Sequence, residues 1–213
     1  KLSQVLKRDV MDKIENIDDI RSLIALGIEE CTTLEYKSGI DTSNNHWKSE
    51  MAKDVSAMAN ANGGIIIYGV KEYDEEDKRH LPEKITPIDV TKISKETIAQ
   101  VISSNISPKI NNLEIDCIVV DAVIPNEVLY VVSVPKSNTA HQNLKTKIYH
   151  KRCVTTINPM EDYEIRDVMN RRVHPDVILD FEIKYCIILS KVASKARLRI
   201  IFHLSERLYS GSI

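Results

Sequence analysis

The chain has 213 residues, enough for one well-packed domain and an additional segment. Its net charge is −2 with 28% charged residues, which excludes a protein coated with basic side chains. No apolar run approaches the roughly 20 residues that span a bilayer, and the charged N-terminal segment lacks the apolar core of a signal peptide. We therefore expect no membrane partner.

Three helices are predicted in the first part of the chain. Apolar residues at helical spacing predict an amphipathic helix within residues 2–14. A second helix follows, which Asp18 or Asp19 can cap and Gly27 ends. The third covers residues 47–60, where alanines permit close packing.

Two strands accompany these helices. Residues 34–37 form a short predicted strand, and residues 65–70 read as a strand buried on both faces. Gly63 and Gly64 lie between a helix and a strand, so they end a helix and do not open one around a phosphate. An acidic loop follows over residues 72–77.

The second half of the chain contains further helices and strands. The predicted elements are a helix at 94–106, strands at 115–120, 128–134 and 147–152, and a helix at 160–171 that Asn158 and Pro159 introduce. After residue 174, two segments at 179–187 and 198–204 alternate apolar and polar residues, which predicts two half-buried strands. They form a β-rich appendage or the start of a truncated second domain.

The four cysteines are far apart and have no zinc-binding spacing. Cys31, Cys117, Cys153 and Cys186 are therefore interpreted as buried, reduced thiols. This interpretation favours a reducing compartment, and we expect a cytoplasmic protein.

Two structural interpretations concern polar residues at helix ends. Asn60 adjoins the glycines, where it can cap the helix or tie strands together. Arg171 and Arg172 are expected to complement the C-terminal end of their own helix.

An ordered set of short motifs runs through the chain. It comprises Glu30, Glu35-Tyr36-Lys37, Ala57-Met58-Ala59-Asn60, Gly63-Gly64, Gly69-Val70-Lys71-Glu72, Val134-Pro135-Lys136-Ser137, Tyr149-His150-Lys151-Arg152 and Thr155-Thr156. This set resembles the AlbA-like nucleic-acid-binding domain of the schlafen family. The resemblance implies an α+β fold with a mixed sheet flanked by helices. Together with the patterns at the two ends, it predicts three parts: an N-terminal amphipathic helix in residues 1–17, the AlbA-like domain in residues 18–173, and a β-rich appendage or the start of a truncated second domain in residues 174–213.

Three glutamates are candidates for a metal site. Glu30 and Glu35 converge only if Glu30 lies in the turn before the strand, because residues an odd number apart on one strand face opposite sides. Glu35 and Lys37 share the polar face of that strand if Leu34 and Tyr36 face the core. Glu72 lies just past the end of the next strand, so pairing of the two strands gathers all three carboxylates.

Such a cluster would suit Mg²⁺ or Mn²⁺. In the ribonuclease members of the resembled family, an acidic triad at these positions is responsible for RNA cleavage. The resemblance therefore implies a catalytic role for Glu30, Glu35 and Glu72. Lys37 would stabilise charge on the phosphate. The third acid is usually Asp in those nucleases, so the longer Glu72 side chain is a departure.

A basic segment is the candidate nucleic-acid surface. After residue 140, bases outnumber acids 13 to 8. The proposed phosphate contacts are Lys145, Lys147, Lys151, Arg152, Thr155 and Thr156. The alternative interpretation is a solvated strand-and-loop face.

The leading functional hypothesis is a nucleic-acid-binding protein with divalent-metal-dependent endoribonuclease activity on folded RNA such as tRNA. RNA is the preferred partner and DNA the second choice. The alternative is a non-catalytic DNA-binding module in regulation or defence, and in a third interpretation the acids are only structural. Because the chain has one copy of each motif, we expect a homodimer that depends on residues 175–213.

Overall fold

The computed structural model describes residues 14–171, which belong to the first of two units into which the chain divides. Nearly all of the helix expected in residues 2–14, and both strands expected after residue 174, lie outside the described residues. No helix in the described part is long and apolar enough to span a bilayer. The three-part division of the chain stays a prediction.

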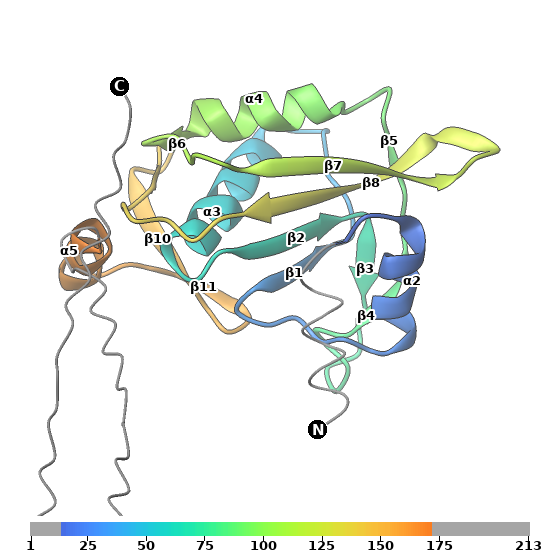
Figure 1. The fold of residues 1–213 in the computed structure, drawn as a ribbon, viewed down its shortest axis with the longest axis horizontal. Coiled ribbons are helices and arrows are strands. Elements are labelled where there is room, and N and C mark those ends of the chain that lie inside the picture. Colours follow the sequence, from blue (N-terminus) through green and yellow to red (C-terminus); the bar gives the residue numbers. More distant parts are fainter. Residues whose placement is uncertain (1–13, 172–213) are drawn as a thin grey trace, which may run out of the picture. The chain divides into compact units, whose positions relative to one another are not determined.

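A five-stranded mixed sheet lies at the centre of the fold (Figure 1). Its strands are β1 (Leu34–Lys37), β2 (Gly64–Tyr68), β5 (Ile88–Asp89), β7 (Glu114–Asp121) and β8 (Ile124–Val134). β1 and β2 are parallel, and β8 pairs antiparallel with β2, β5 and β7. The expected α+β class with a mixed sheet flanked by helices is confirmed.

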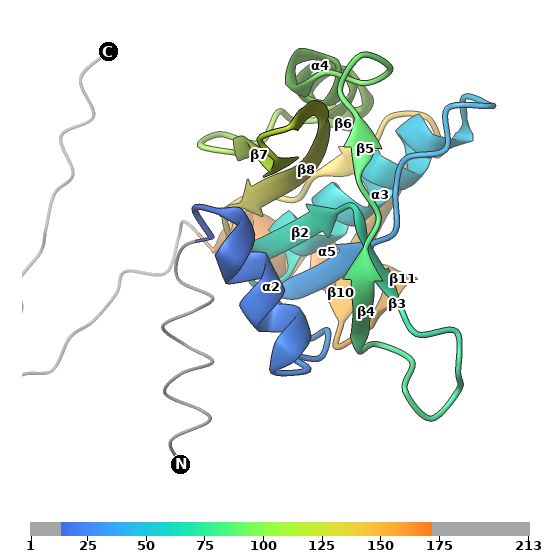
Figure 2. The ribbon, with the colours of Figure 1, turned by 90° about the vertical axis from the view of Figure 1, so that its right-hand side faces the viewer.

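Helices cover both faces of this sheet because successive side chains of a strand point to opposite sides. On one face, α3 (His46–Asn60) and α4 (Lys95–Asn105) share a core with Tyr130 of β8. On the other, α2 (Ile17–Ala25) shares a core with the preceding residue, Leu129. Figures 1 and 2 show α2 on the opposite side of the sheet from α3.

A capping box sets the start of α2. The side-chain oxygen of Asn16 accepts hydrogen bonds from the N–H groups of Asp18 at 2.9 Å and Asp19 at 3.2 Å, and the Asp19 carboxylate accepts from the Asn16 N–H at 3.1 Å. The expected cap at Asp18 or Asp19 is therefore wrong, because this reciprocal pairing needs a cap three residues before the acid. Gly27 follows the C-cap with a φ of +57°, as expected for the end of a helix.

The strand expected over residues 65–70 is interrupted at Gly69, whose φ is +103°. β2 ends at Tyr68, and the chain continues as β3 (Val70–Glu72), which pairs with β4 (Pro82–Ile85) in a separate two-stranded ribbon. A Cβ at Gly69 would lie 2.2 Å from the Leu129 side chain, so a larger residue would not fit. This break carries Glu72 out of the central sheet.

A second sheet of four antiparallel strands comprises β6 (Ile106–Ser107), β9 (Gln142–Asn143), β10 (Ile148–Cys153) and β11 (Thr156–Pro159). The strand expected at residues 147–152 is β10. The other three strands were not expected, because segments of two to four residues are too short to show a periodic pattern.

Asn60 fastens this second sheet to α3. Its side-chain amide donates to the backbone oxygens of His141 at 2.9 Å and His150 at 2.8 Å, and its side-chain oxygen accepts from the His141 N–H at 2.7 Å. The expected structural role of Asn60 is confirmed.

The last described helix, α5 (Asp162–Asn170), begins later than expected, because Pro159 lies in β11 and Glu161 is the N-cap. Arg171 does not complement its own helix. Its guanidinium donates to the backbone oxygens of Asn60 at 2.8 Å, Ala61 at 3.3 Å and Ser137 at 2.9 Å, so it caps the C-terminal end of α3.

Three of the four cysteines lie in the described residues, and all three are free thiols. Cys117 is exposed on β7, while Cys31 and Cys153 are partly exposed. The expectation that these thiols are buried is therefore wrong.

Candidate functional site

An acidic cleft of about 440 Å³ lies where the turn before β1, the end of β3 and the turn between β10 and β11 approach one another. In Figure 2, β3 and β4 lie beside β1, with β10 and β11 close by. The residues that line it are Glu30, Glu35, Tyr36, Lys37, Ser38, Lys71, Glu72, Tyr73, Asp74, Arg79, His80 and Thr155. The cleft thus contains all four residues expected to be catalytic.

A tight turn brings Glu30 back alongside β1. The backbone groups of Cys31 and Leu34 bond to each other, at 3.0 Å and 3.4 Å, which reverses the chain between them. One carboxylate oxygen of Glu30 then accepts from the Tyr36 N–H at 2.8 Å. The requirement that Glu30 lie in a turn before the strand is met.

His80 joins Glu30 on the cleft wall. Its backbone oxygen accepts from the Glu30 N–H at 2.9 Å, and its Nδ1 lies 3.2 Å from the second Glu30 carboxylate oxygen. The Glu30 side chain is only 4% exposed, so it is fixed by groups around it. A buried carboxylate with this many polar contacts is rigidly positioned.

Glu72 completes this group. Its Oε1 lies 3.7 Å from His80 Nδ1, yet this oxygen is buried and has no hydrogen-bond partner among residues 14–171. Burial raises the pKa of Glu72, and the nearby negative charge of Glu30 raises it further. One ligand atom each from Glu30, Glu72 and His80 lie within 4.8 Å of one another.

His80 was not a candidate in the sequence. It lies in the loop between β3 and β4 with a φ of +79°, in the left-handed region. Nothing local marks this residue, because its approach to Glu30 depends on how the β3–β4 ribbon folds back. Its partners are 50 and 8 residues away along the chain.

Glu35 lies in a different environment from Glu30. Its side chain is 7% exposed, and its two oxygens form ion pairs with Arg152 and with Lys37. Arg152 also donates to the backbone oxygens of Cys31 at 2.9 Å and Leu34 at 3.1 Å. The face of β1 that carries Glu35 is therefore polar, as expected, but it is covered by protein.

Lys37 connects this buried network to the cleft. Its amine contacts Glu35 and lies 3.6 Å from Asp54 of α3. Burial raises the pKa of Asp54, although the positive charge of Lys37 opposes this effect. Asp54 was not a candidate either, because its position on α3 shows no local signal for contact with β1.

The residues expected to contact nucleic acid do not form one surface. Lys145 and Lys147 are exposed in the turn before β10. Lys151 pairs with Glu164 of α5, and Arg152 is buried with a side chain that is 2% exposed. Arg152 is therefore a clamp on β1 and not a phosphate contact, which corrects the interpretation of this residue.

Thr155 and Thr156 also separate. Thr155 lines the acidic cleft, whereas the exposed Thr156 donates its hydroxyl to the Cys153 backbone oxygen at 3.0 Å. Of the six expected contacts, only Lys145, Lys147 and Thr155 present side chains that are free of an ion pair or a hydrogen bond within the described residues.

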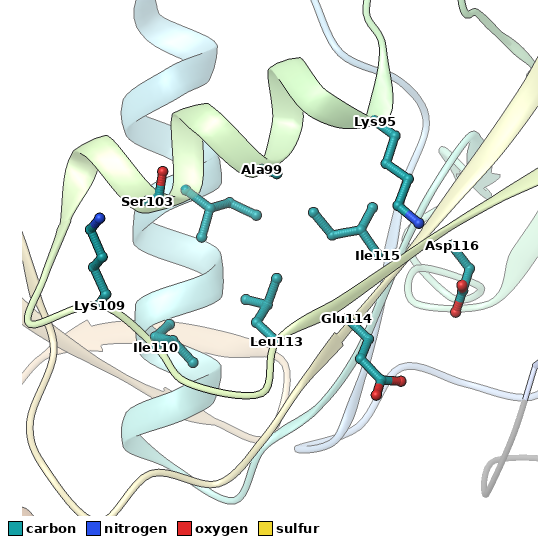
Figure 3. Close-up of a pocket in the computed structure, with 10 residues that line it drawn as sticks. Lys95, Ala99, Ser103, Lys109, Ile110, Leu113, Glu114, Ile115 and Asp116 are labelled. Carbon is teal, nitrogen blue, oxygen red and sulfur yellow. The ribbon is translucent and has the colours of Figure 1, made fainter. Parts of the chain in front are cut away.

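Another hollow, of about 490 Å³, lies between α4 and β7 (Figure 3). Its floor is apolar, with Leu113 and Ile115 facing α4, and Lys95 and Lys109 lie at its two ends. It has no group of metal-ligating side chains of the kind found in the acidic cleft, among the residues that the structure describes. The acidic cleft is therefore the candidate site.

A search of curated proteins finds no significant match. Among solved structures, the chain is similar to the crystal structure of the DIP2311 protein from Corynebacterium diphtheriae, with a TM-score of 0.45 and 12% sequence identity. That similarity covers 76% of this chain and 30% of the other chain, so this chain spans less than a third of the length of that protein.

The sequence model of the family described as Schlafen, AlbA_2 matches residues 30–161. The match contains Glu30, Glu35, Lys37, Glu72 and His80, and it covers well over half of the chain. Family membership supports the broader functional expectation, a nucleic-acid-binding domain. The chain belongs to the Schlafen AlbA_2 family.

Proposed function

We propose that the protein is a divalent-metal-dependent endoribonuclease that acts on folded RNA such as tRNA. The observation that carries this proposal is the acidic cleft, in which two carboxyl groups face each other beside a lysine amine. A cleft that holds like charges together and has a perturbed pKa is a frequent sign of function.

The residues present fit a divalent cation. Glu30 and Glu72 supply hard oxygen donors, which Mg²⁺ and Mn²⁺ prefer. The buried Glu72 Oε1 has no partner among the described residues, and such an oxygen is costly unless a cation or a proton satisfies it. When bound, the cation would polarise a phosphate oxygen and make its own water more acidic.

The side chains around this position have distinct roles. Lys37, held between Glu35 and Asp54, would place a positive charge against the reacting phosphate. Thr155 would donate a hydroxyl hydrogen bond to the backbone of the RNA. Glu35 acts through Lys37 in this scheme, so it is a positioning residue and not a free carboxylate.

Lys145 and Lys147 supply further phosphate contacts in this proposal. They are exposed, and contacts of this kind carry no sequence information. Recognition would therefore depend on the shape of a folded RNA, which is how proteins commonly read double-stranded RNA.

The test is cleavage of folded tRNA by the full chain with Mg²⁺ or Mn²⁺. Glu72→Gln keeps the shape of the side chain but removes the negative charge of a proposed ligand, so it should lower the rate by about 100-fold, since loss of even an outer-shell partner costs about 10- to 100-fold. Glu114→Gln is the matched control, because Glu114 is exposed on β7 and outside the cleft. Full cleavage in Glu72→Gln, or in excess chelator, would falsify the proposal.

Glu35→Gln is less suitable for this test. Its carboxylate is buried against Arg152, so this change would disturb the fold as well as the chemistry.

The alternative, a non-catalytic DNA-binding module, predicts a different outcome from the same assay. Retention of tRNA or duplex DNA on the protein, with no cleavage in any metal, would favour it. The expected homodimer remains part of the proposal, since residues 175–213 lie outside the described residues. Light scattering that gives a monomeric mass at micromolar concentration would contradict the dimer.

A further inference from the structure

The ligand atoms that the structure gathers differ from the three glutamates of the sequence hypothesis. Glu30, Glu72 and His80 come from three separate segments: the turn before β1, the end of β3 and the loop between β3 and β4. Their ligand atoms lie within 4.8 Å of one another, and Glu35 is not a member of that group.

We propose that Glu30, Glu72 and His80 form a three-ligand site for a first-row transition-metal ion in preference to Mg²⁺, with Glu35 outside the coordination sphere. This inference rests on the cation of the proposed function and names its ligands and its selectivity. It assigns the third position to an imidazole nitrogen.

Glu35 is excluded because both of its oxygens are already in use. One pairs with Arg152, whose side chain is 2% exposed, and the other with Lys37. Moving Glu35 to a metal would leave the buried guanidinium without its partner, a change that is strongly unfavourable in protein interiors.

His80 is placed for coordination by its backbone. Its carbonyl oxygen accepts from the Glu30 N–H at 2.9 Å, and the adjoining Leu81 is tied to the loop through hydrogen bonds to Lys78 at 3.0 Å and Tyr73 at 3.1 Å. Nδ1 lies 3.2 Å from a Glu30 oxygen and 3.7 Å from Glu72 Oε1. Within the described part of the chain the buried Glu72 oxygen has no hydrogen-bond partner, and one ion between these atoms would be coordinated by all three side chains.

The donor set determines the selectivity. Mg²⁺ binds oxygen ligands and water, whereas imidazole nitrogen is a good ligand for transition metals. Two carboxylates and one imidazole leave further positions for water and a phosphate oxygen. If a carboxylate replaced the imidazole of His80, the cleft would no longer prefer a transition metal to Mg²⁺.

The test uses Mn²⁺ and the full chain. Pulsed electron paramagnetic resonance of bound Mn²⁺ should show coupling to one imidazole nitrogen, and this coupling should be absent in His80→Ala. His80→Ala should also weaken Mn²⁺ affinity by at least about tenfold, the lower end of the effect of removing even an outer-shell partner. Mg²⁺ affinity should change less.

Two further variants sharpen the result. His80→Asp makes the site all oxygen, so it should lose the nitrogen coupling and bind Mg²⁺ more tightly relative to Mn²⁺. His46→Asn is the matched control, since the His46 side chain is 71% exposed and outside the cleft, and it should keep both the coupling and the affinity. Circular dichroism shows which variants are folded.

The site is overturned if Mn²⁺ does not bind, if bound Mn²⁺ shows no nitrogen coupling in the unaltered protein, or if His80→Ala keeps the coupling. These outcomes are separate from those for the nuclease. A protein that binds Mn²⁺ through His80 but cleaves no RNA keeps the site and loses the proposed activity, whereas cleavage with unchanged Mn²⁺ binding in His80→Ala does the reverse.

Discussion

Two charged clusters adjoin β1, and they differ in how completely their charges are paired. In one cluster, base and acid alternate along the chain of contacts from Arg152 to Glu35, Lys37 and Asp54. Glu30 and Glu72 instead bring two carboxyl groups together beside His80, and neither forms a direct ion pair with a Lys or Arg side chain among residues 14–171. The paired cluster holds the second sheet against β1, because Arg152 of β10 bonds to Glu35 and to the backbone of Leu34. The acid-rich cluster is the cation site that we propose. Glutamate thus has a structural role in the paired cluster, and we propose a ligand role for it in the acid-rich one.

The largest expected effect is the loss of the paired cluster. Arg152→Ala leaves Glu35 buried without its main partner, so we expect the free energy of unfolding to fall by about 3–5 kcal/mol. Denaturant unfolding measures this change. The control is Lys151→Ala on the same strand, which breaks a more exposed pair with Glu164 and should cost about 1 kcal/mol or less. Equal losses in the two variants would contradict a structural clamp.

The acid-rich cluster should respond to metal instead. At a free Mn²⁺ concentration about 100 times its dissociation constant, binding to the native state alone stabilises a protein by about 2.7 kcal/mol. We expect this stabilisation in the unaltered chain and in Glu114→Gln, and little of it in Glu72→Gln. Thermal unfolding with and without Mn²⁺ provides the measurement. If Mn²⁺ stabilised Glu72→Gln as much as the unaltered chain, the acid-rich cluster would not be the metal site.

A smaller effect concerns pH and the incomplete pairing of Asp54. Burial raises the pKa of Asp54, so the folded state keeps its proton at pH values where the unfolded chain has lost it. The contribution of Asp54 to stability therefore falls as pH rises from about 3.8 through the raised folded value. Asp54→Asn has no such dependence.

The measurement is the free energy of unfolding of both proteins across this pH range. The stability of Asp54→Asn relative to the unaltered chain should increase with pH. A difference that stays constant, or that decreases, would show that Lys37 fully compensates the buried charge.

The smallest effect on stability is expected outside both clusters. Lys145 and Lys147 are exposed, so replacing both with Ala should change the free energy of unfolding by less than about 0.5 kcal/mol. Nucleic-acid binding should nevertheless weaken, and the slope of log affinity against log salt should flatten by about 0.7 to 0.9 for each lost phosphate contact. An unchanged slope would place the binding surface elsewhere.

The sequence was informative wherever a signal is local. Apolar periodicity placed α3, α4, β7, β8 and β10, and Gly27 marked the end of α2. It also indicated that Glu30 must lie in a turn, because strand geometry allows no other route to convergence. Short strands such as β6 and β9 were not predicted, because two residues are too few to show a periodic pattern.

Most errors concern where a side chain finds its partner. The sequence predicted that Arg152 is a basic residue on the surface. In the structure it is buried against Glu35, which lies 117 residues earlier in the chain. Arg171 was expected to interact with the C-terminal end of its own helix, yet it caps the C-terminal end of α3. The continuous strand expected over residues 65–70 breaks at Gly69, because the φ of this residue is +103° and not that of an extended strand.

The sequence by itself determined the family, the mixed α+β fold and the presence of acids beside β1. Only the tertiary structure decided which of these acids are paired. The physical reason is that a carboxylate's role depends on the charges within a few ångströms, and those belong to segments far away along the chain. The fold places Arg152 against Glu35 and His80 against Glu30. These two contacts distinguish the structural clamp from the candidate metal site.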